Sequence, residues 1–254
     1  MKIALFADSY LPYLSGVTVS IEALRQTLTQ AGHDVMIFAP EYPDAQPDDA
    51  VVRVPSLPVP YIPTFRVSLP LATTQWMRLT DFEPDVIHAH SPFQMGVIAG
   101  WQARRLKKPL VYTMHTFFSQ YGHYVPFLGR QRGGLFLSRW VRRFCNQCQA
   151  VIVPSESARQ WLIDMAVKSP ITVIPSGIDT AEAALASQDG VRALYKIPTD
   201  APLIMTVGRL AREKNLFFLL EAFAQVLTTE PRSMLLIAAT GPYEEELKKK
   251  TADL

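Results

Sequence analysis

The stretch "KIALFADSYLPYLSGVTVSIEALRQTLTQAGHDVMIFAP", residues 2–40, contains two apolar runs separated by one helical pattern. The runs "KIALFAD" (2–8) and "DVMIFAP" (34–40) lack the alternation of a half-buried strand, so each predicts a strand covered on both faces. Between them, residues 17–31 carry an apolar side chain every three or four positions, and Gly32 ends the helix. A buried strand, a helix and a second buried strand indicate the repeating unit of a parallel sheet.

The same alternation continues to residue 177. Five further apolar runs predict strands: "VVRVP" (51–55), "DVIHAH" (85–90), "PLVYTMH" (109–115), "AVIVPS" (150–155) and "ITVIPSG" (171–177). Helical patterns cover residues 70–82, 92–105, 134–148 and 155–166. Residues 55–70 carry five prolines and predict a loop that is neither a central strand nor a helix. Seven buried strands joined by helices predict an α/β domain, residues 1–177, with a complete, Rossmann-like, doubly wound parallel sheet.

A second unit follows a polar connector, residues 178–200. Its expected elements are a strand at 201–208, a helix at 213–229, a strand at 234–240 and a helix at 243–251. Two strands and two helices do not cover both faces of an open parallel sheet. We therefore expect residues 201–254 to be the first two strand–helix units of a domain whose remainder is absent, with apolar strand faces exposed unless they dock elsewhere.

The composition is that of a soluble globular protein, with 48% hydrophobic and 19% charged residues among 254. No run approaches the ~18 apolar residues of a membrane-spanning helix, and the N-terminus does not resemble a signal peptide, so a cytoplasmic location is expected. Cys145 and Cys148 form a C-x-x-C at the end of a helical pattern. We interpret them as ordinary helix residues, because a redox pair opens a helix and a zinc site needs a second pair. No metal or other cofactor is expected.

The net charge of +2 hides a basic middle section, since residues 86–155 contain no Asp or Glu. The helical pattern 134–148 places Leu137, Trp140, Val141, Phe144 and Cys148 on one side and Arg139, Arg142 and Arg143 on the other. Arg130 and Arg132 come just before it. The pattern fits a sheet-covering helix with its arginines in water, or a helix on an anionic bilayer. The acid-free surroundings favour peripheral contact with the inner face of the plasma membrane through Arg130, Arg132, Arg139, Trp140, Arg142 and Arg143.

A nucleic-acid-binding module is the alternative use of this basic surface. No known nucleic-acid motif occurs, and the arginines are not interleaved with stacking aromatic residues along one strand. We therefore expect no nucleic-acid partner.

Ligands of open α/β sheets bind beyond the carboxyl ends of the strands, where helix N-termini offer unpaired N–H groups. The first such turn lacks the G-x-G-x-x-G pattern, which disfavours a dinucleotide dehydrogenase. Its Gly16 follows Ser15, a plausible N-cap. Gly16 either allows a phosphate or sugar to approach the backbone closely, or only relieves a tight turn.

His115 ends the apolar run 109–115 and so is expected at the ligand-binding edge of the sheet. It is either a group that contacts ligand or a structural hydrogen-bonding residue. Tyr121, His123 and Tyr124 lie in the aromatic loop that comes next. Such a loop suits a pocket for a sugar or lipid, although aromatic residues also anchor loops to a core.

The turn "TVGRLAREKN", residues 206–215, opens the second unit. Gly208 permits a sharp exit from the strand, and Arg209 presents a planar guanidinium that grips two phosphate oxygens at once. Lys214 adds a point charge near the start of the next helix. The pattern predicts a site for a diphosphate. The alternative is a solvated turn in which Glu213 pairs with one of the cations.

The segment "VGRLAREKNLFFLLEAF" resembles the G-R-x-x-x-E-K signature of family 4 glycosyltransferases, retaining enzymes with the GT-B fold of two facing Rossmann-like domains. Other segments resemble the family in the same order: "FADSYLPYLSGVTVSIEALRQTLTQAGHDV", "PDVIHAHSPF", "VYTMHT", "VIVPSES", "VIPSGID" and "ATGPYEEELKKK". The stretch "HTFFSQYGHYVP" looks most like the subgroup that glucosylates diacylglycerol.

The resemblance implies that Arg209 and Lys214 bind the diphosphate of a nucleotide-sugar donor, UDP- or GDP-linked. It also implies that His115 hydrogen-bonds the donor sugar and that Gly16 brings N–H groups to the phosphate or acceptor. A hexose would move with retention, without a required metal, to a lipid acceptor such as diacylglycerol. Residues 1–177 would bind the acceptor, and residues 201–254 would begin the donor domain.

One motif of the family is missing from this chain. The E-x₇-E motif that binds the donor's sugar and ribose would lie beyond Leu254, so we expect these residues alone not to turn over. Three alternatives remain: a glycosyltransferase acting on another glycolipid or a soluble sugar, a GT-B sugar-nucleotide 2-epimerase, and a non-catalytic basic module that binds anionic membranes or nucleic acid.

Overall fold

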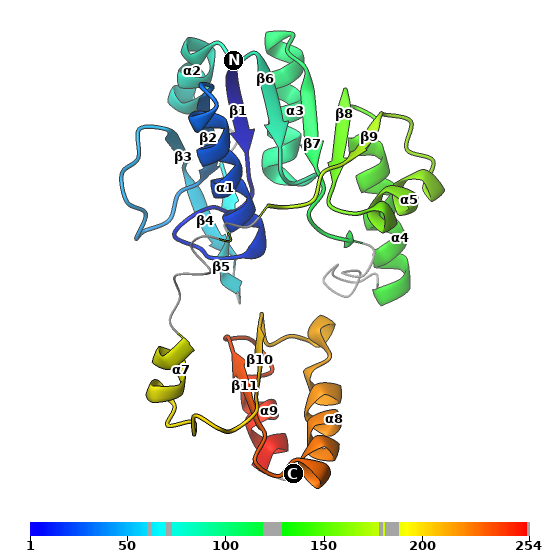
Figure 1. The fold of residues 1–254 in the computed structure, drawn as a ribbon. Helices are drawn as coiled ribbons and strands as arrows, with labels where there is room; N and C mark the ends of the chain where they lie inside the picture. The colour runs from blue at the N-terminus through cyan, green and yellow to red at the C-terminus, as the bar shows by residue number, and fades with distance from the viewer. Residues whose placement is uncertain (60–61, 70–72, 119–128, 178–179, 181–187, 253–254) are drawn as a thin grey trace. The chain divides into compact units, whose positions relative to one another are not determined.

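The computed structural model describes the chain except residues 60–61, 70–72, 119–128, 178–179, 181–187 and 253–254 (Figure 1). For residues 62–65, 73, 129–130 and 188–189 it describes the backbone alone. The chain divides into two compact units, Met1–Ile178 and Asp179–Leu254.

A seven-stranded parallel sheet forms the centre of the first unit. Its strands are β1 (Lys2–Phe6), β2 (Asp34–Pro40), β3 (Val51–Val54), β6 (Val86–Ala89), β7 (Leu110–Thr113), β8 (Ala150–Val153) and β9 (Ile171–Val173). They lie in the order β3-β2-β1-β6-β7-β8-β9, and every neighbouring pair is parallel. All seven strands coincide with predicted apolar runs, which confirms the doubly wound α/β fold. The order in which the strands are added reverses between β1 and β6: β2 and β3 lie on one side of β1, and the later strands lie on the other. Ligands of such sheets bind beyond the strand ends at this switch point.

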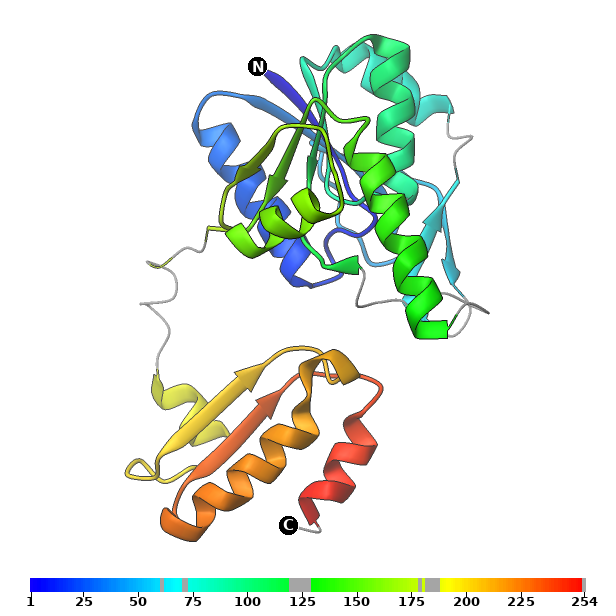
Figure 2. The same ribbon diagram turned by 90° about the vertical axis from the view of Figure 1, so that its right-hand side faces the viewer.

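Helices cover the two faces of this sheet (Figure 2). They are α1 (Gly16–Gln30), α2 (Thr73–Phe82), α3 (Gln94–Leu106), α4 (Gly129–Cys145) and α5 (Glu156–Asp164). Successive side chains of β1 alternate between the faces: Leu5 packs in one core with Ile21 of α1, and Phe6 packs in the other with Trp76 of α2. Because both cores are apolar, the strands read as continuous hydrophobic runs in the sequence. Within the described ranges, no helix has the length and apolarity needed to span a bilayer.

The proline-rich segment contains two paired strands, so the predicted loop at 55–70 is wrong. Strand β4 (Ser56–Val59) pairs antiparallel with β5 (Ile62–Ser68), outside the parallel sheet. A two-stranded ribbon tolerates proline because the N–H of each residue is needed on one side at most. The expectation that this segment is not a central strand holds.

The second unit contains a two-stranded parallel sheet of β10 (Leu203–Val207) and β11 (Met234–Ala238). Its helices are α7 (Gln188–Leu194), the short 3-10 helix η2 (Arg212–Lys214), α8 (Leu216–Thr229) and α9 (Glu244–Ala252). Helix α7 falls in the segment that the sequence analysis treated as a connector. Met205 and Val207 of β10 are 49% and 73% exposed, which agrees with the expectation of apolar strand faces without cover.

Candidate functional site

Asp8 lies just beyond the carboxyl end of β1, beside the point where the order of the strands reverses. The Ser91 hydroxyl donates a hydrogen bond to one carboxylate oxygen, and the Met95 N–H at the start of α3 donates to the other at 2.6 Å. Burial raises the pKa of Asp8, and these two hydrogen bonds oppose the rise. Asp8 therefore joins the turn after β1 to the N-terminus of α3. The sequence analysis did not single it out.

His115 lies just beyond β7 and contacts a second histidine. His90 Nδ1 and His115 Nε2 are 3.0 Å apart, and the His90 ring also lies 4.3 Å from that of His88. His88 Nε2 is 2.7 Å from the Thr113 hydroxyl. Burial lowers the pKa of His88 to about 3, that of His115 to about 4, and that of His90 well below its usual value. All three imidazoles are therefore neutral near pH 7.

The contact between His90 and His115 requires one hydrogen between two nitrogens. His90 Nε2 is buried and has no partner in the described part of the chain. A buried N–H without a partner is rarer than an unused acceptor, so the favoured form has Nδ1–H of His90 donating to His115 Nε2. The ring of His115 then keeps its hydrogen on Nδ1. That N–H has no partner in the described residues and can donate to a ligand.

Gly16 begins α1 beside the same edge of the sheet. Ser15 caps the helix by accepting from the Thr18 N–H at 3.2 Å, and the Thr18 hydroxyl accepts from the Ser15 N–H at 2.8 Å. A Cβ added at Gly16 meets no atom within 4 Å, and Gly16 is not among the described residues with positive φ. Neither packing nor backbone conformation of this chain therefore requires glycine here, and the space in front of the helix is open.

Arg209 and Lys214 lie in the turn between β10 and α8, and both are exposed. The Lys214 side chain folds over the turn, because its Cε lies 3.6 Å from the position of a Cβ on Gly208. Among the residues described, neither cation has a carboxylate within 4.0 Å, and Glu213 pairs with neither. Two cations before a helix N-terminus, without a carboxylate partner in the described residues, have the charge that an anion would need.

A second turn holds this one in place. The Leu210 N–H donates to the Thr240 carbonyl at 3.1 Å, and the Tyr243 N–H donates to the Leu210 carbonyl at 3.0 Å. A Cβ on Gly241 would lie 2.4 Å from the Leu210 carbonyl oxygen, so only glycine permits this approach. The G-P pair at 241–242 was a sequence signal for a turn, but its contact with the cationic turn was not visible.

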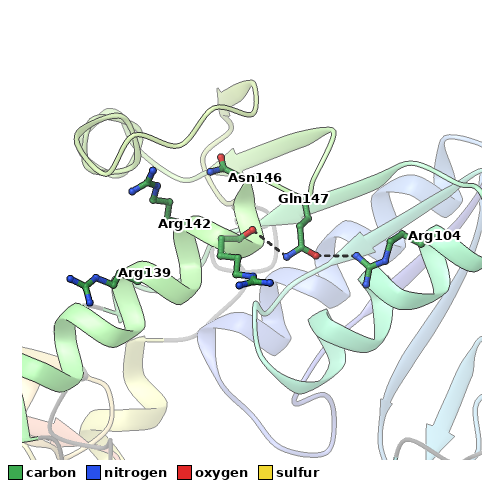
Figure 3. Close-up of a pocket in the computed structure, with 6 residues that line it drawn as sticks. Arg104, Arg139, Arg142, Asn146 and Gln147 are labelled. Carbon is green, nitrogen blue, oxygen red and sulfur yellow. Dashed lines mark hydrogen bonds between the residues drawn. The ribbon is translucent and has the colours of Figure 1, made fainter.

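The outer surface of α4 borders a basic cavity of about 670 Å³. It is lined by Arg104, Arg139, Arg142, Arg143, Asn146 and Gln147 (Figure 3). Arg104 of α3 donates to the Gln147 side-chain oxygen at 3.0 Å, and the Gln147 amide donates to the Arg143 carbonyl at 3.3 Å. In the part of the chain that is described, none of the four arginines has a carboxylate partner. The sequence analysis did not assign Arg104 of the acid-free section to this surface, because Arg104 belongs to a different helix.

Helix α4 begins at Gly129, so Arg130 and Arg132 belong to the helix and do not precede it. The apolar side of α4 packs into the core, and the Trp140 N–H donates to the Pro92 carbonyl at 2.8 Å. Trp140 therefore does not belong to the exposed face that carries the arginines. Leu135 and Phe136, 60% and 51% exposed, lie on that outer face instead.

Several predicted residues cannot be placed. Tyr121, His123, Tyr124 and the side chain of Arg130 lie outside the described residues.

Cys145 and Cys148 are buried free thiols, and burial raises the pKa of both. The residues that are described contain no group of three or more His, Cys, Asp or Glu side chains placed to hold a metal ion.

The architecture defines the class of protein to which the chain belongs. Anabaena Alr3699/HepE, solved in complex with UDP-glucose, is similar in fold, with a TM-score of 0.70 and 15% identity over 100% of this chain and 66% of that one. The chain is thus an α/β protein of the GT-B type. Residues 14–182 match the profile "Glycosyltransferase Family 4", and residues 188–254 match "Glycosyl transferases group 1". The chain belongs to glycosyltransferase family 4.

Two relatives are named alpha-monoglucosyldiacylglycerol synthase. The protein of Streptococcus pneumoniae is 33% identical over 100% of this chain and 59% of the relative. That of Acholeplasma laidlawii is 30% identical over 98% of this chain and 66% of the relative. The chain thus spans roughly three fifths of the length of the curated relatives it matches.

Proposed function

We propose that the protein transfers a hexose from a nucleoside-diphosphate sugar, UDP- or GDP-linked, to a lipid acceptor such as diacylglycerol, with retention at the anomeric carbon. The observation that carries the proposal is the position of Arg209 and Lys214 before the N-terminus of α8, with no carboxylate partner for either among the described residues. Family membership and the names of the two relatives support the reaction class and the lipid acceptor.

Charge stabilisation is the main task in this reaction, because the diphosphate gains negative charge as the bond to the sugar breaks. Arg209 grips phosphate oxygens through parallel N–H groups, and Lys214 adds a second positive charge. Gly16 lets a ligand approach the unpaired N–H groups of α1. His115, kept neutral by burial, donates from Nδ1 to a sugar hydroxyl. In this proposal the first unit binds the acceptor and the second begins the donor site.

Replacing both cations in the full-length protein tests the proposal. The double variant Arg209→Ala/Lys214→Ala is expected to lower kcat/KM by about 100-fold or more, as loss of charge-stabilising donors does elsewhere. Donor affinity, measured by calorimetry with UDP-glucose and GDP-mannose, should fall as well. Arg212→Ala is the matched control, because Arg212 is an exposed cation of the same η2 turn with no assigned role. If the double variant keeps the affinity and turnover of the control, the proposal is wrong.

Two narrower parts of the proposal have their own measurements. Retention is tested by the coupling constant of the anomeric proton in the product, which separates an α- from a β-linked hexose. Because the chain spans 59% of the first relative, we also propose that residues 1–254 alone do not complete transfer. Turnover by these residues alone would contradict that part and leave the role of the cations to be judged separately.

The outer face of α4 is proposed to bind anionic membrane at the inner face of the plasma membrane. This face combines the exposed apolar pair Leu135 and Phe136 with Arg132, Arg139, Arg142 and Arg143. Each basic residue near an anionic leaflet contributes about 1 kcal/mol. Charge complementarity therefore favours phosphate-bearing lipids over neutral ones.

Liposome co-sedimentation tests this surface. Changing Arg139, Arg142 and Arg143 to Gln should weaken binding to vesicles containing phosphatidylglycerol by about 100-fold, since three contributions of roughly 1 kcal/mol are lost. Arg159→Gln, an exposed change on α5, serves as the control. Binding that does not depend on anionic lipid or salt would overturn the assignment.

A further inference from the structure

Two buried polar atoms in the first unit have no partner in the described residues and belong to residues that line one cavity. They are the Tyr42 hydroxyl oxygen and Arg53 Nε. The cavity measures about 460 Å³ and lies between segment 41–49, strand β3 and the start of α2. Buried polar atoms in proteins almost always have a hydrogen-bond partner, and each one without a partner costs about 1–3 kcal/mol. Two such atoms around one cavity indicate a partner that the chain itself does not supply.

Tyr42 follows β2 by two residues, so it lies at the carboxyl edge of the sheet. The Arg66 guanidinium lies 5.8 Å from the centre of its ring. Two hydrogen bonds of 2.9 Å to Ser56 fix that guanidinium in place. Burial raises the pKa of Tyr42 to about 12, so its hydroxyl keeps a hydrogen to donate. Arg66 of β5 thus packs against the ring of Tyr42, while the Tyr42 hydroxyl has no partner among the described residues.

Arg53 lies near the carboxyl end of β3, and its guanidinium stacks over the Tyr10 ring at 5.6 Å. Its Nη1 donates weakly to the Pro40 carbonyl at 3.4 Å. No carboxylate of the described residues lies within 4.0 Å of it, and burial lowers its pKa. The charges of Asp48 and Glu41, which also line the cavity, oppose this fall in pKa, but the effect of burial is the larger one. An oxygen from a ligand would satisfy both its N–H and its charge.

We propose that Tyr42 and Arg53 bind an oxygen atom of the polar head of the acceptor, either a hydroxyl or a phosphate oxygen. This inference rests on the proposed function, because it takes the first unit to be the acceptor-binding one. The position supports it: Tyr42 lies just beyond the carboxyl end of β2, which pairs with β1 in the sheet. The cavity therefore reaches the carboxyl edge of the sheet at β2 and β3, and ligands of this fold bind along that edge.

Tyr42→Phe in the full-length protein is the central test. Because the hydroxyl has no partner within the described chain, its removal is expected to leave the Tm of the ligand-free protein unchanged or higher. The KM for the diacylglycerol acceptor should rise about tenfold, the equivalent of one hydrogen bond of about 1.4 kcal/mol, with kcat little changed. Arg53→Lys, which keeps the charge but loses Nε, should have the same effect on the acceptor KM.

Tyr112→Phe is the matched control. Its hydroxyl is also buried without a described partner, but its ring packs in the core against Phe144 at 5.1 Å. This change should leave the acceptor KM unaltered. If Tyr42→Phe lowers the Tm, or leaves the acceptor KM at the level of Tyr112→Phe, the hydroxyl serves the fold and the inference is wrong.

A binding measurement separates this inference from the proposed function. Thermal-shift titrations of the protein with glycerol and with glycerol 3-phosphate need no turnover. A shift that Tyr42→Phe removes supports the site, and a response to glycerol 3-phosphate alone assigns the oxygen to a phosphate. If neither probe binds and the acceptor KM is unchanged, the inference fails while the donor cations can still be essential. If the cations prove dispensable, the probe titration still decides the inference.

Discussion

Burial holds three neighbouring histidines of the first unit in the neutral form, and this has a consequence for stability. His88 is 7% exposed, and its neutral ring contacts Thr113 through Nε2. In an unfolded chain the same ring takes up a proton near pH 6.5. A fall in pH therefore stabilises the unfolded state first, because the folded state binds this proton only near pH 3.

We predict that the free energy of unfolding falls as the pH is lowered from 7.5 to 5. The contribution of His88 alone is about 2 kcal/mol, from its pKa of about 3 in the folded state. Asp8 works in the opposite direction, since its pKa is raised and its proton favours the folded state as the pH falls. Urea unfolding at the two pH values measures the difference.

Two variants separate the effect of His88 protonation on stability from the effect of its hydrogen bond to Thr113. His88→Gln should reduce the pH difference by about 2 kcal/mol, because one titrating group is gone. Thr113→Val keeps the histidine and removes its partner, so it should lower stability by similar amounts at both pH values. An unchanged pH difference in His88→Gln would contradict the explanation.

At the level of single residues, sequence position predicted which side chains lie just beyond a strand but not which side chains face them. His115 was placed correctly beyond β7 because ligand edges of parallel sheets are defined by strand ends. Its partner His90 lies just beyond another strand, β6, and only the pairing of His88 with Val111 in the sheet brings the two rings together. The atoms of Tyr42 and Arg53 that lack a partner in the described residues had no sequence signal, because an unmade hydrogen bond is a property of three-dimensional packing.

Helix α3 is pressed against the turn after β6, and a glycine permits the contact. A Cβ on Gly96 would lie 1.8 Å from the Ser91 carbonyl oxygen and 3.1 Å from the Phe144 ring. The same helix start supplies the Met95 N–H to Asp8. Any outward shift of α3 would therefore also disturb the turn beyond β1.

We predict that Gly96→Ala destabilises the first unit by about 3 kcal/mol, at the upper end of overpacking effects. Gly100→Ala on the same helix is the control, because its Cβ would meet Leu110 at 3.6 Å, an ordinary contact. The higher helix propensity of alanine should stabilise that variant by up to about 1 kcal/mol. Urea unfolding of both variants measures the contrast. Equal stabilities would show that α3 does not depend on this close approach.

Helix boundaries were predicted less well than helix positions. The sequence analysis began one helix at residue 134, whereas α4 begins at Gly129. Glycines usually argue against a helix, but Gly133 and Gly134 are buried. Burial of a helix face outweighs the weak intrinsic preference of two residues. The pairing of β4 and β5 was missed for a related reason, since proline excludes a central strand but not a short ribbon.

The whole molecule follows the alternation of apolar runs and helical patterns because both faces of its parallel sheet are covered. That pattern was sufficient to predict the seven strands of the sheet and the two strands β10 and β11. The order of the strands was not contained in it. The strand order reverses because β6 pairs with β1 on the side opposite β2. A pattern of apolar runs does not record on which side of the sheet a new strand is added.

The two units differ greatly in the size of their cores, and we predict a matching difference in local stability. The first unit contains two extensive apolar clusters, centred on residues such as Phe6 and Leu5. The buried residues of the second unit's cluster are Leu210, Leu216, Leu220 and Leu247. Little buried area and exposed strand residues allow frequent local opening. In hydrogen exchange of residues 1–254 followed by mass spectrometry, β10 and β11 should therefore exchange faster than β1 and β6.

The comparison is internal to one sample, so pH and temperature affect both units alike. Peptides from β10 and from β1 are both strand peptides in parallel sheets, and their difference reports packing and not secondary structure. Equal protection in the two units would mean that the exposed side chains of β10, among them Val207 at 73% exposure, are covered in solution. If β10 exchanges slowly only at high protein concentration, a second copy of the chain covers its side chains. Concentration-independent rapid exchange in β10 is the result that the small core predicts.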